Sequence, residues 1–306
     1  MKTLVVLLGP TGVGKTELSL SLAEKLGSPI LNCDSRQLFS GLKIGTAAPT
    51  DEQQRRVRHY FVSQLPLDAY YSAAQYETDV LQLTEDLFQT HDTLLLSGGS
   101  MMYIDAVCQG IDDIPTISES IRSEVKHQLA QNGLTALLDE LRERDPEYYA
   151  IVDKQNTRRV VHAIEVCRMS GKTYTSFRTH SPKQRPFRII KIGLDRPREE
   201  LFQRINDRVE QMMKDGLLDE VRAFTAYRHC NALNTVGYKE LLHVLDGEWE
   251  LGMAVERIKK NTRVYAKKQL TWFRHDKTIR WFHPDDKDQI LHYLNKALYE
   301  TDYATH

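Results

Sequence analysis

A glycine-rich segment near the amino terminus has the residue types and the spacing of a phosphate-binding loop. It follows a short apolar run and precedes a helical pattern, which is the context that this motif requires. The glycines let backbone N–H groups turn toward phosphate oxygens, Lys15 adds a positive charge, and the Thr16 hydroxyl can bind Mg²⁺. We therefore expect a phosphate compound, which the loop alone does not identify, to bind Gly9, Pro10, Thr11, Gly12, Val13, Gly14, Lys15 and Thr16.

No acidic residue stands where a P-loop nucleoside triphosphatase usually carries one. In such enzymes an Asp at the end of a second apolar strand helps to hold Mg²⁺. The best candidate strand, Leu94–Leu96, is instead followed by Ser97-Gly98-Gly99-Ser100. This argues against a motor or switch ATPase, although another strand could supply the acid.

A carboxylate is expected beside the phosphate loop. Asp34-Ser35-Arg36-Gln37 follows the segment 29–33, which has the pattern of a second strand. Strand ends in a doubly wound sheet line one crevice, so Asp34 would lie near the phosphates and could take a proton from an attacking nucleophile. Arg36 and Gln37 could bind base edges. Taken alone, the four residues fit equally well with Asp34 as the cap of the next helix.

The elements that position these groups alternate between strands and helices. Segments 3–8, 29–33, 93–97 and 187–194 have the apolar pattern of strands buried on both faces. Leu18, Leu22 and Leu26 form the apolar stripe of a helix that ends at Gly27, and Ser72–Gln75 is a capping box that begins another helix. We predict an α/β fold, a P-loop doubly wound, mostly parallel sheet.

Strand patterns stop in the middle of the chain. A capping box at Thr116–Glu119 begins a helical region in which Asn132-Gly133 ends the first helix. We predict a helical insertion domain at residues 117–185, within a core formed by 1–116 and 186–306. Helices are expected in the last third of the chain at 198–214, 217–227, 238–245 and 254–274.

Two segments are strongly basic. Residues 154–191 hold ten Lys or Arg against one acid, and residues 257–280 hold nine against one. In the second segment Lys260, Lys267 and Arg274 recur every seven residues, while Tyr265 and Trp272 predict a buried aromatic stripe on another side. A basic run alone is more often a solvated helix face, but two of them beside a phosphate crevice favour RNA binding.

The overall composition is that of an ordinary globular protein. Of 306 residues, 41 % are hydrophobic, and 41 Lys and Arg against 42 Asp and Glu give a net charge of −1, which excludes a disordered or collagen-like chain. The sequence has no apolar run near the ~20 residues that cross a bilayer and no secretory signal. The four cysteines are far apart. We therefore expect a cytoplasmic monomer without membrane association.

The motifs together resemble those of the tRNA dimethylallyltransferase (tRNA isopentenyltransferase) family. Besides the phosphate loop and Asp34–Gln37, the resemblance rests on segments in the same order along the chain. The late segment Lys267–Arg274 is the most specific of these. The others are Ile44–Pro49, Gly98–Ile104, Ala163–Val166, Ser170–Lys172, Arg204–Arg208 with Met212, Gly216-Leu217 and Thr235–Lys239.

The resemblance implies a reaction. The loop would hold the diphosphate of dimethylallyl diphosphate with Mg²⁺, and the N6 amine of the adenosine at tRNA position 37, beside the anticodon, would attack the allylic carbon. It implies catalytic roles for Asp34 as general base and for Lys15, Thr16, Ser100 and Arg208 at the diphosphate. It implies contacts to the tRNA anticodon stem-loop from Asp34, Ser35, Arg36, Gln37, Arg158, Arg159, His162, Lys239, Lys267, Lys268 and Arg274.

The chain departs from the family pattern at a few positions. Arg158 stands where the family has Gln, and His162 stands where it has Arg, so that a partly buried neutral histidine is an equal alternative to an RNA contact there. Ala48 replaces a usual lysine. Three other functions stay open from the residues alone: a small-molecule P-loop kinase, a prenyltransferase acting on free adenine nucleotides, and an RNA-binding ATPase module.

Overall fold

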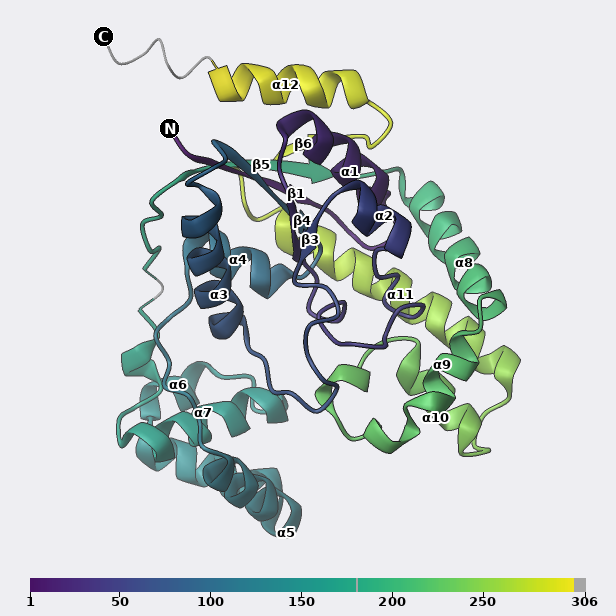
Figure 1. Cartoon of the computed structure of the whole chain (residues 1–306). Coiled ribbons are helices and arrows are strands. Elements are labelled where there is room, and N and C mark those ends of the chain that lie inside the picture. The colour runs from purple at the N-terminus through teal and green to yellow at the C-terminus, as the bar shows by residue number, and fades with distance from the viewer. Residues whose placement is uncertain (180, 300–306) are drawn as a thin grey trace. The chain divides into compact units, whose positions relative to one another are not determined.

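The structure, a computed structural model, describes residues 1–179 and 181–299. Within them, six parallel strands form one sheet in the order β3-β2-β4-β1-β5-β6 (Figure 1). The α/β fold with a parallel sheet is as predicted. The strands are β1 (Thr3–Leu8), β2 (Ile30–Cys33), β3 (His59–Tyr60), β4 (Thr93–Gly98), β5 (Arg188–Leu194) and β6 (Arg280–Phe282).

The strand order places β4 between β1 and β2. Residues 3–8 of β1 pair with residues 93–98 of β4, which in turn pairs with β2 through Cys33 opposite Gly98. Chain order suggests that the phosphate loop and Asp34 follow neighbouring strands. In the structure they do not, because β4 separates β1 from β2. The segment after β4 lies between them.

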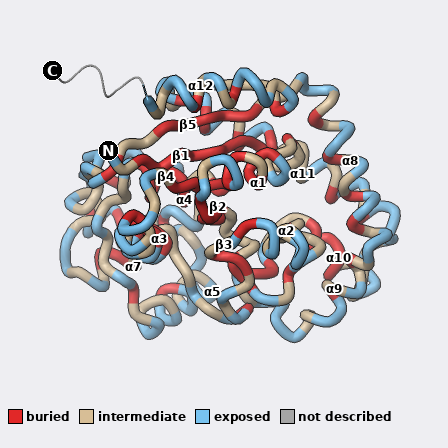
Figure 2. Tube along the Cα trace, turned by 45° about the horizontal axis from the view of Figure 1, so that its top comes forward, coloured by how far each residue is buried: buried red, intermediate tan, exposed pale blue. Residues whose placement is uncertain are grey.

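Alternate side chains of β1 point to opposite faces of the sheet and divide the core into two layers. Leu4, Val6 and Leu8 pack with α3 and α4, whereas Val5 and Leu7 pack with α1, α8 and α12. Figure 2 shows that β1 and nearly all of β4 are buried. The helices are α1 (Lys15–Leu26), α3 (Ala73–Leu87), α4 (Met101–Gln109), α8 (Arg198–Lys214) and α12 (Lys287–Tyr299).

A third apolar cluster joins α8 to the helices that follow it. It contains Val209 of α8, Leu217 of α9, Tyr238 of α10 and Ile258 of α11, all nearly inaccessible to water. The long helix α11 thereby becomes part of the core and reaches the sheet through Phe273. The bounds are α2 (Asp51–Arg56), α9 (Leu217–Ala223), α10 (Tyr238–Leu245) and α11 (Leu251–Phe273).

Some local predictions are confirmed and others are wrong. Gly27 ends α1 in the left-handed conformation, and Ser72 caps α3 in a full capping box. The capping box expected at Thr116 is wrong, because Ser118 caps the next helix instead. The buried aromatic stripe of α11 is also wrong, since Tyr265 is 37 % exposed and Trp272 is 43 % exposed.

The chain folds into two compact units, the first formed by Met1–Cys108 with the chain from Arg185 on, and the second by Gln109–Gln184. The second begins before Ile117 because its two connecting segments bind one another: Lys183 N–H donates to the Gln109 carbonyl at 2.7 Å. Its helices are α5 (Glu119–Arg144), interrupted at Gly133, α6 (Pro146–Ile151) and α7 (Thr157–Ser170).

Among the helices of residues 1–179 and 181–299, none combines the length and the apolar character that crossing a lipid bilayer demands.

Candidate functional site

The phosphate loop connects β1 to α1 and takes its shape from glycine. Gly12 and Gly14 have φ of +82° and +108°, a region that other residues rarely adopt, and Gly14 is the cap residue of α1. A Cβ at Gly12 would also lie 2.8 Å from the Ile205 side chain of α8. The sequence therefore forms a tight loop at the amino end of a helix, where an anion is stabilised by the helix dipole.

A cavity of about 900 Å³ opens beside this loop. It brings together most of the expected catalytic side chains, Lys15, Thr16, Asp34 and Arg208. Gly99, which follows β4, also lines it, and α11 contributes Tyr265 and Gln269. The expected diphosphate-binding and proton-accepting groups thus share one space.

Lys15 folds back on the loop. Its Nζ donates hydrogen bonds of 2.8 Å to the carbonyl oxygens of both Gly9 and Pro10. Burial lowers the pKa of this ammonium to about 7, an effect that Asp34 opposes and Arg208 reinforces. Negative phosphate oxygens would stabilise the protonated form of Lys15 and raise its pKa, as expected of a lysine that binds diphosphate.

Asp34 lies at the end of β2 and serves two purposes. Its Oδ1 accepts hydrogen bonds from the backbone N–H of Arg36 at 2.8 Å and of Gln37 at 3.3 Å. These bonds close a turn, and the next helix, α2, begins only at Asp51, so the alternative in which Asp34 caps a helix is wrong. Its Oδ2 forms no hydrogen bond or ion pair with any residue that the structure describes. The half-buried carboxylate lines the cavity, and the turn fixes it while one oxygen remains available to accept a proton.

Ser100 is placed differently from its expected role as a donor to the substrate. Its buried hydroxyl accepts a 2.8 Å hydrogen bond from Ser35 N–H, and the side chain does not line the cavity. Gly98 precedes it at a crowded point, since a Cβ there would lie 2.0 Å from the Cys33 carbonyl oxygen. Glycine at positions 98 and 99 thus permits close packing against Cys33 and Gln269 within the protein.

Three arginines near or on α8 hold the phosphate loop from outside. Arg208 Nη1 lies 3.5 Å from the Thr11 hydroxyl, Arg204 Nε donates to the Gly12 carbonyl at 3.1 Å, and Arg196 Nε donates to the Val13 carbonyl at 2.8 Å. Burial lowers the pKa of Arg208 from its usual value, and Asp34 opposes the shift. The Arg208 side chain lines the same cavity as Lys15 and Asp34.

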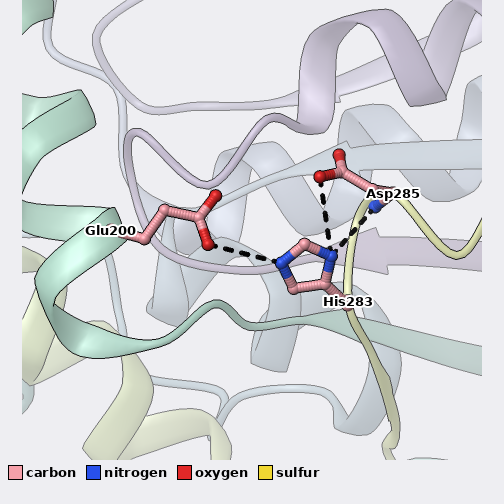
Figure 3. Close-up of side chains that lie close together, drawn as sticks. All are labelled: Glu200, His283 and Asp285. Carbon is pink, nitrogen blue, oxygen red and sulfur yellow. Dashed lines mark hydrogen bonds and ion pairs between the residues drawn. The ribbon is translucent and has the colours of Figure 1, made fainter.

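Glu200, His283 and Asp285 form a close cluster (Figure 3), and Arg196 pairs with two of its members. His283 Nε2 lies 3.5 Å from Glu200, and the same three residue types could in principle hold a metal. However, the Arg196 guanidinium, whose side chain is 6 % exposed, pairs with Asp285 at 2.7 Å and also with Glu200. The cluster already has a cation, and we interpret it as the anchor that directs Arg196 to the loop.

The donor set of the cavity fits Mg²⁺ bound together with a diphosphate. Thr16 is exposed and lines the cavity, as do Asp34 and Asp207. Glu17 and Asp285 also line it, but they pair with arginines at 2.8 and 2.7 Å. Mg²⁺ usually takes few protein oxygens and completes its shell with phosphate and water, so this sparse set is sufficient.

The expected base-reading residues mostly hold the protein's own backbone. Gln37 Nε2 donates to the carbonyls of Thr46 and Ala47 at 3.0 Å each, and Arg36 donates to the Asn231 carbonyl at 2.5 Å. Both therefore brace loops around the cavity. Gln37 still lines that cavity, and its side-chain oxygen remains an available acceptor.

The basic residues expected at tRNA lie on or next to three helices, α7, α10 and α11. On α11 and α10, Lys267, Lys268, Arg274 and Lys239 are exposed, and Arg274 pairs with Asp195 at 2.6 Å. Lys267 and Arg274 line a second cavity of about 770 Å³.

In the second unit, Arg158 and Arg159 are exposed in the first turn of α7. His162 is half-buried and packs edge-on against Tyr174, with ring centres 5.6 Å apart.

Two residues that contact the phosphate loop were assigned no role in the sequence interpretation. Arg196 and Gln269 both contact the phosphate loop, the latter through Thr11 N–H at 2.9 Å. Gln269 had a detectable signal, because it stands at helical spacing between the buried Ala266 and Phe273, where an apolar residue is normal. No sequence pattern pointed to Arg196, because its contacts with the phosphate loop arise only in the folded protein.

Comparisons with known proteins cover nearly the whole chain. Residues 37–276 match the family described as IPP transferase. A protein of Phocaeicola vulgatus named tRNA dimethylallyltransferase 1 is 61 % identical over 295 residues, covering 96 % of this chain and 98 % of that protein. A protein of the same name from Bacteroides thetaiotaomicron is 60 % identical over 294 residues, covering 96 % of each.

Solved structures are similar as well. The full-length tRNA isopentenylpyrophosphate transferase of Bacillus halodurans is 32 % identical, with a TM-score of 0.72 over 99 % of this chain and 98 % of that one. A eukaryotic dimethylallyltransferase acting on tRNA has a TM-score of 0.75 at 24 % identity, over 89 % of this chain and 70 % of that one. The latter likeness concerns the fold alone, and both agree with the predicted architecture.

Proposed function

Because this chain belongs to the IPP transferase family, we propose that it transfers a dimethylallyl group from dimethylallyl diphosphate to N6 of an adenosine in tRNA, at position 37 beside the anticodon. The single observation that carries the mechanism is the shared cavity: the phosphate loop and the Asp34 carboxylate line the same space. A diphosphate ester in the loop would present its allylic carbon to an amine held by Asp34.

The reaction forms one bond and breaks another. The N6 nitrogen bonds to the allylic carbon, the bond from that carbon to the diphosphate oxygen breaks, and diphosphate leaves. Asp34 accepts the N6 proton and orients the amine. Lys15, Arg208 and the loop N–H groups stabilise the charge that grows on the leaving group. Mg²⁺ bound near Thr16 would supply further positive charge to the same oxygens.

The tRNA would be held chiefly through its phosphates. The exposed Arg158 and Arg159 of α7 and the exposed Lys267 and Lys268 of α11 offer separate basic surfaces for the anticodon stem-loop. The target adenine must leave the stacked loop to reach Asp34, at a cost of a few kcal/mol. We further propose that the protein acts as a monomer in the cytoplasm, where unmodified tRNA is found.

Incubation with labelled dimethylallyl diphosphate and unmodified total tRNA, followed by nucleoside analysis, tests this function. We expect label on N6 of one adenosine per acceptor tRNA, and removal of Mg²⁺ by chelation should stop its incorporation. ATP-dependent phosphorylation of a small molecule without incorporation would instead indicate a kinase. Label on AMP with none on tRNA would indicate a prenyltransferase for free nucleotides.

A further inference from the structure

Gln269 connects the phosphate loop to the segment after β4, and the proposed mechanism requires a fixed distance between this loop and Asp34. Its side chain lies on α11 and is 2 % exposed. The Oε1 atom accepts a 2.9 Å hydrogen bond from Thr11 N–H in the phosphate loop, and Nε2 donates a 2.7 Å hydrogen bond to the Gly99 carbonyl after β4. One amide thus connects the ends of β1 and β4.

The connection continues to the proposed base. Ser100, the next residue after Gly99, donates its backbone N–H to the Cys33 carbonyl at 3.2 Å, and its hydroxyl accepts Ser35 N–H at 2.8 Å. Cys33 and Ser35 flank Asp34. Because β4 lies between β1 and β2, this series of hydrogen bonds spans the whole distance from the phosphate loop to the carboxylate.

The site accepts only a side chain with one acceptor and one donor at fixed positions. A Cβ at Gly99 would lie 2.6 Å from Gln269 Nε2, so the amide fits against a bare backbone. Ala266 and Phe273 on the same helix are 0 % and 2 % exposed, which fixes the helix beneath it. Of the side chains of this length, glutamine alone offers both groups without a charge.

We propose that Gln269 is a positioning residue that sets the distance between the diphosphate cradle and Asp34. This inference rests on the proposed function, because it assigns Gln269 to the alignment of the two substrates. A displacement of about 1 Å between reacting groups can cost about 10²-fold in rate, so a residue that touches neither substrate can still control turnover.

Gln269→Ala tests the proposal by separating rate from binding. We expect kcat to fall about 10- to 100-fold, while direct binding of inorganic diphosphate changes less than about threefold, since Lys15 and the loop remain. Hydrogen exchange at Thr11 N–H should become faster because its acceptor is lost. Gln82→Ala is the matched control, because Gln82 is an exposed glutamine of α3 and does not line the cavity.

Gln269→Glu provides a readout that a loss of stability would not reproduce. A protonated carboxyl accepts and donates in the same positions as the amide, whereas the ionised form repels the Gly99 carbonyl. The rate of this variant relative to wild type should therefore rise at least about tenfold as the pH falls from about 8 to about 5.5, with burial raising the pKa of the new carboxyl.

The outcomes separate this inference from the function itself. If the kcat of Gln269→Ala lies within about twofold of the wild-type kcat, the positioning role is overturned, and the proposed function is not. A flat ratio of Gln269→Glu to wild type across the pH range, or a loss of rate matched by an equal loss of folded protein, would also overturn it. Absence of turnover in the wild type would overturn the proposed function, and with it the alignment that Gln269 is said to serve.

Discussion

Burial lowers the pKa of the Lys15 ammonium to about 7, and the carboxylate of Asp34, which lines the same cavity, opposes this shift. The two residues reach the cavity from the ends of strands separated by β4. A positive group that is costly to charge and a carboxylate with one unengaged oxygen are suited to the two different substrates of the proposed reaction. The phosphate end meets the lysine, and the attacking amine meets the acid.

Asp34→Asn should abolish most turnover. Asparagine retains an oxygen for the N–H groups of Arg36 and Gln37, so the turn is preserved, but it cannot accept the N6 proton. We expect kcat to fall by at least about 10²-fold with little change in tRNA affinity, measured by label incorporation and by filter binding. The exposed Asp68→Asn serves as control. Normal turnover in Asp34→Asn would remove the proposed base.

Diphosphate binding should take up protons above neutral pH. Burial lowers the pKa of Lys15 from its ordinary value of 10.5 to about 7, so the group is mostly neutral at about pH 8. Bound phosphate oxygens favour the charged form and raise that pKa, which requires net uptake of up to about one proton per diphosphate at about pH 8. Affinity should accordingly fall as the pH rises from 7 toward 10.5.

Calorimetry in buffers of different ionisation enthalpy measures this uptake directly. Lys15→Met is the appropriate comparison, because it removes the titrating group while keeping an unbranched side chain. The variant should bind diphosphate more weakly and take up fewer protons. Equal proton uptake by both proteins would show that another group is responsible.

Substitutions at the two basic surfaces should weaken tRNA binding and reduce its salt dependence. Arg159→Gln on α7 and Lys267→Gln on α11 each remove one exposed charge. If each contacts a phosphate, the slope of log affinity against log salt should fall by about 1 for each variant. Lys126→Gln, an exposed change on α5, is the control. A slope identical to wild type would exclude the substituted residue from the RNA interface.

Glu220→Gln should destabilise the protein through the segment Lys43–Gly45. The Glu220 carboxylate accepts N–H groups from all three residues of this segment at 2.8–3.0 Å and the Tyr238 hydroxyl at 2.6 Å. An amide would turn its own NH₂ group toward these donors. We expect a loss of about 1–3 kcal/mol in the free energy of unfolding, measured by urea denaturation.

The exposed Glu143→Gln should change this free energy by less than about 0.5 kcal/mol. A similarly small effect of Glu220→Gln would show that the three N–H groups are equally well satisfied by water.

Local features of this protein could be predicted because their causes lie within a few residues. The phosphate loop, the Gly27 helix end, the Ser72 cap and helix α8 at Arg198–Lys214 all follow from neighbouring side chains and are found in the structure. The short strands β3 and β6, of two and three residues, have too few positions to show a period. They exist because the sheet edges provide partners.

The arrangement of the site depended on contacts between distant residues. Thr11 and Gln269 are 258 positions apart, and no local pattern links them. The strand order that inserts β4 between the loop and Asp34 likewise follows from packing of helices on both faces of the sheet. The sequence by itself determined which chemical groups are present and which turns present them. The tertiary structure decided which hydrogen bonds those groups already make, and hence that Ser100 and Gln37 brace the site while Asp34 remains available to react.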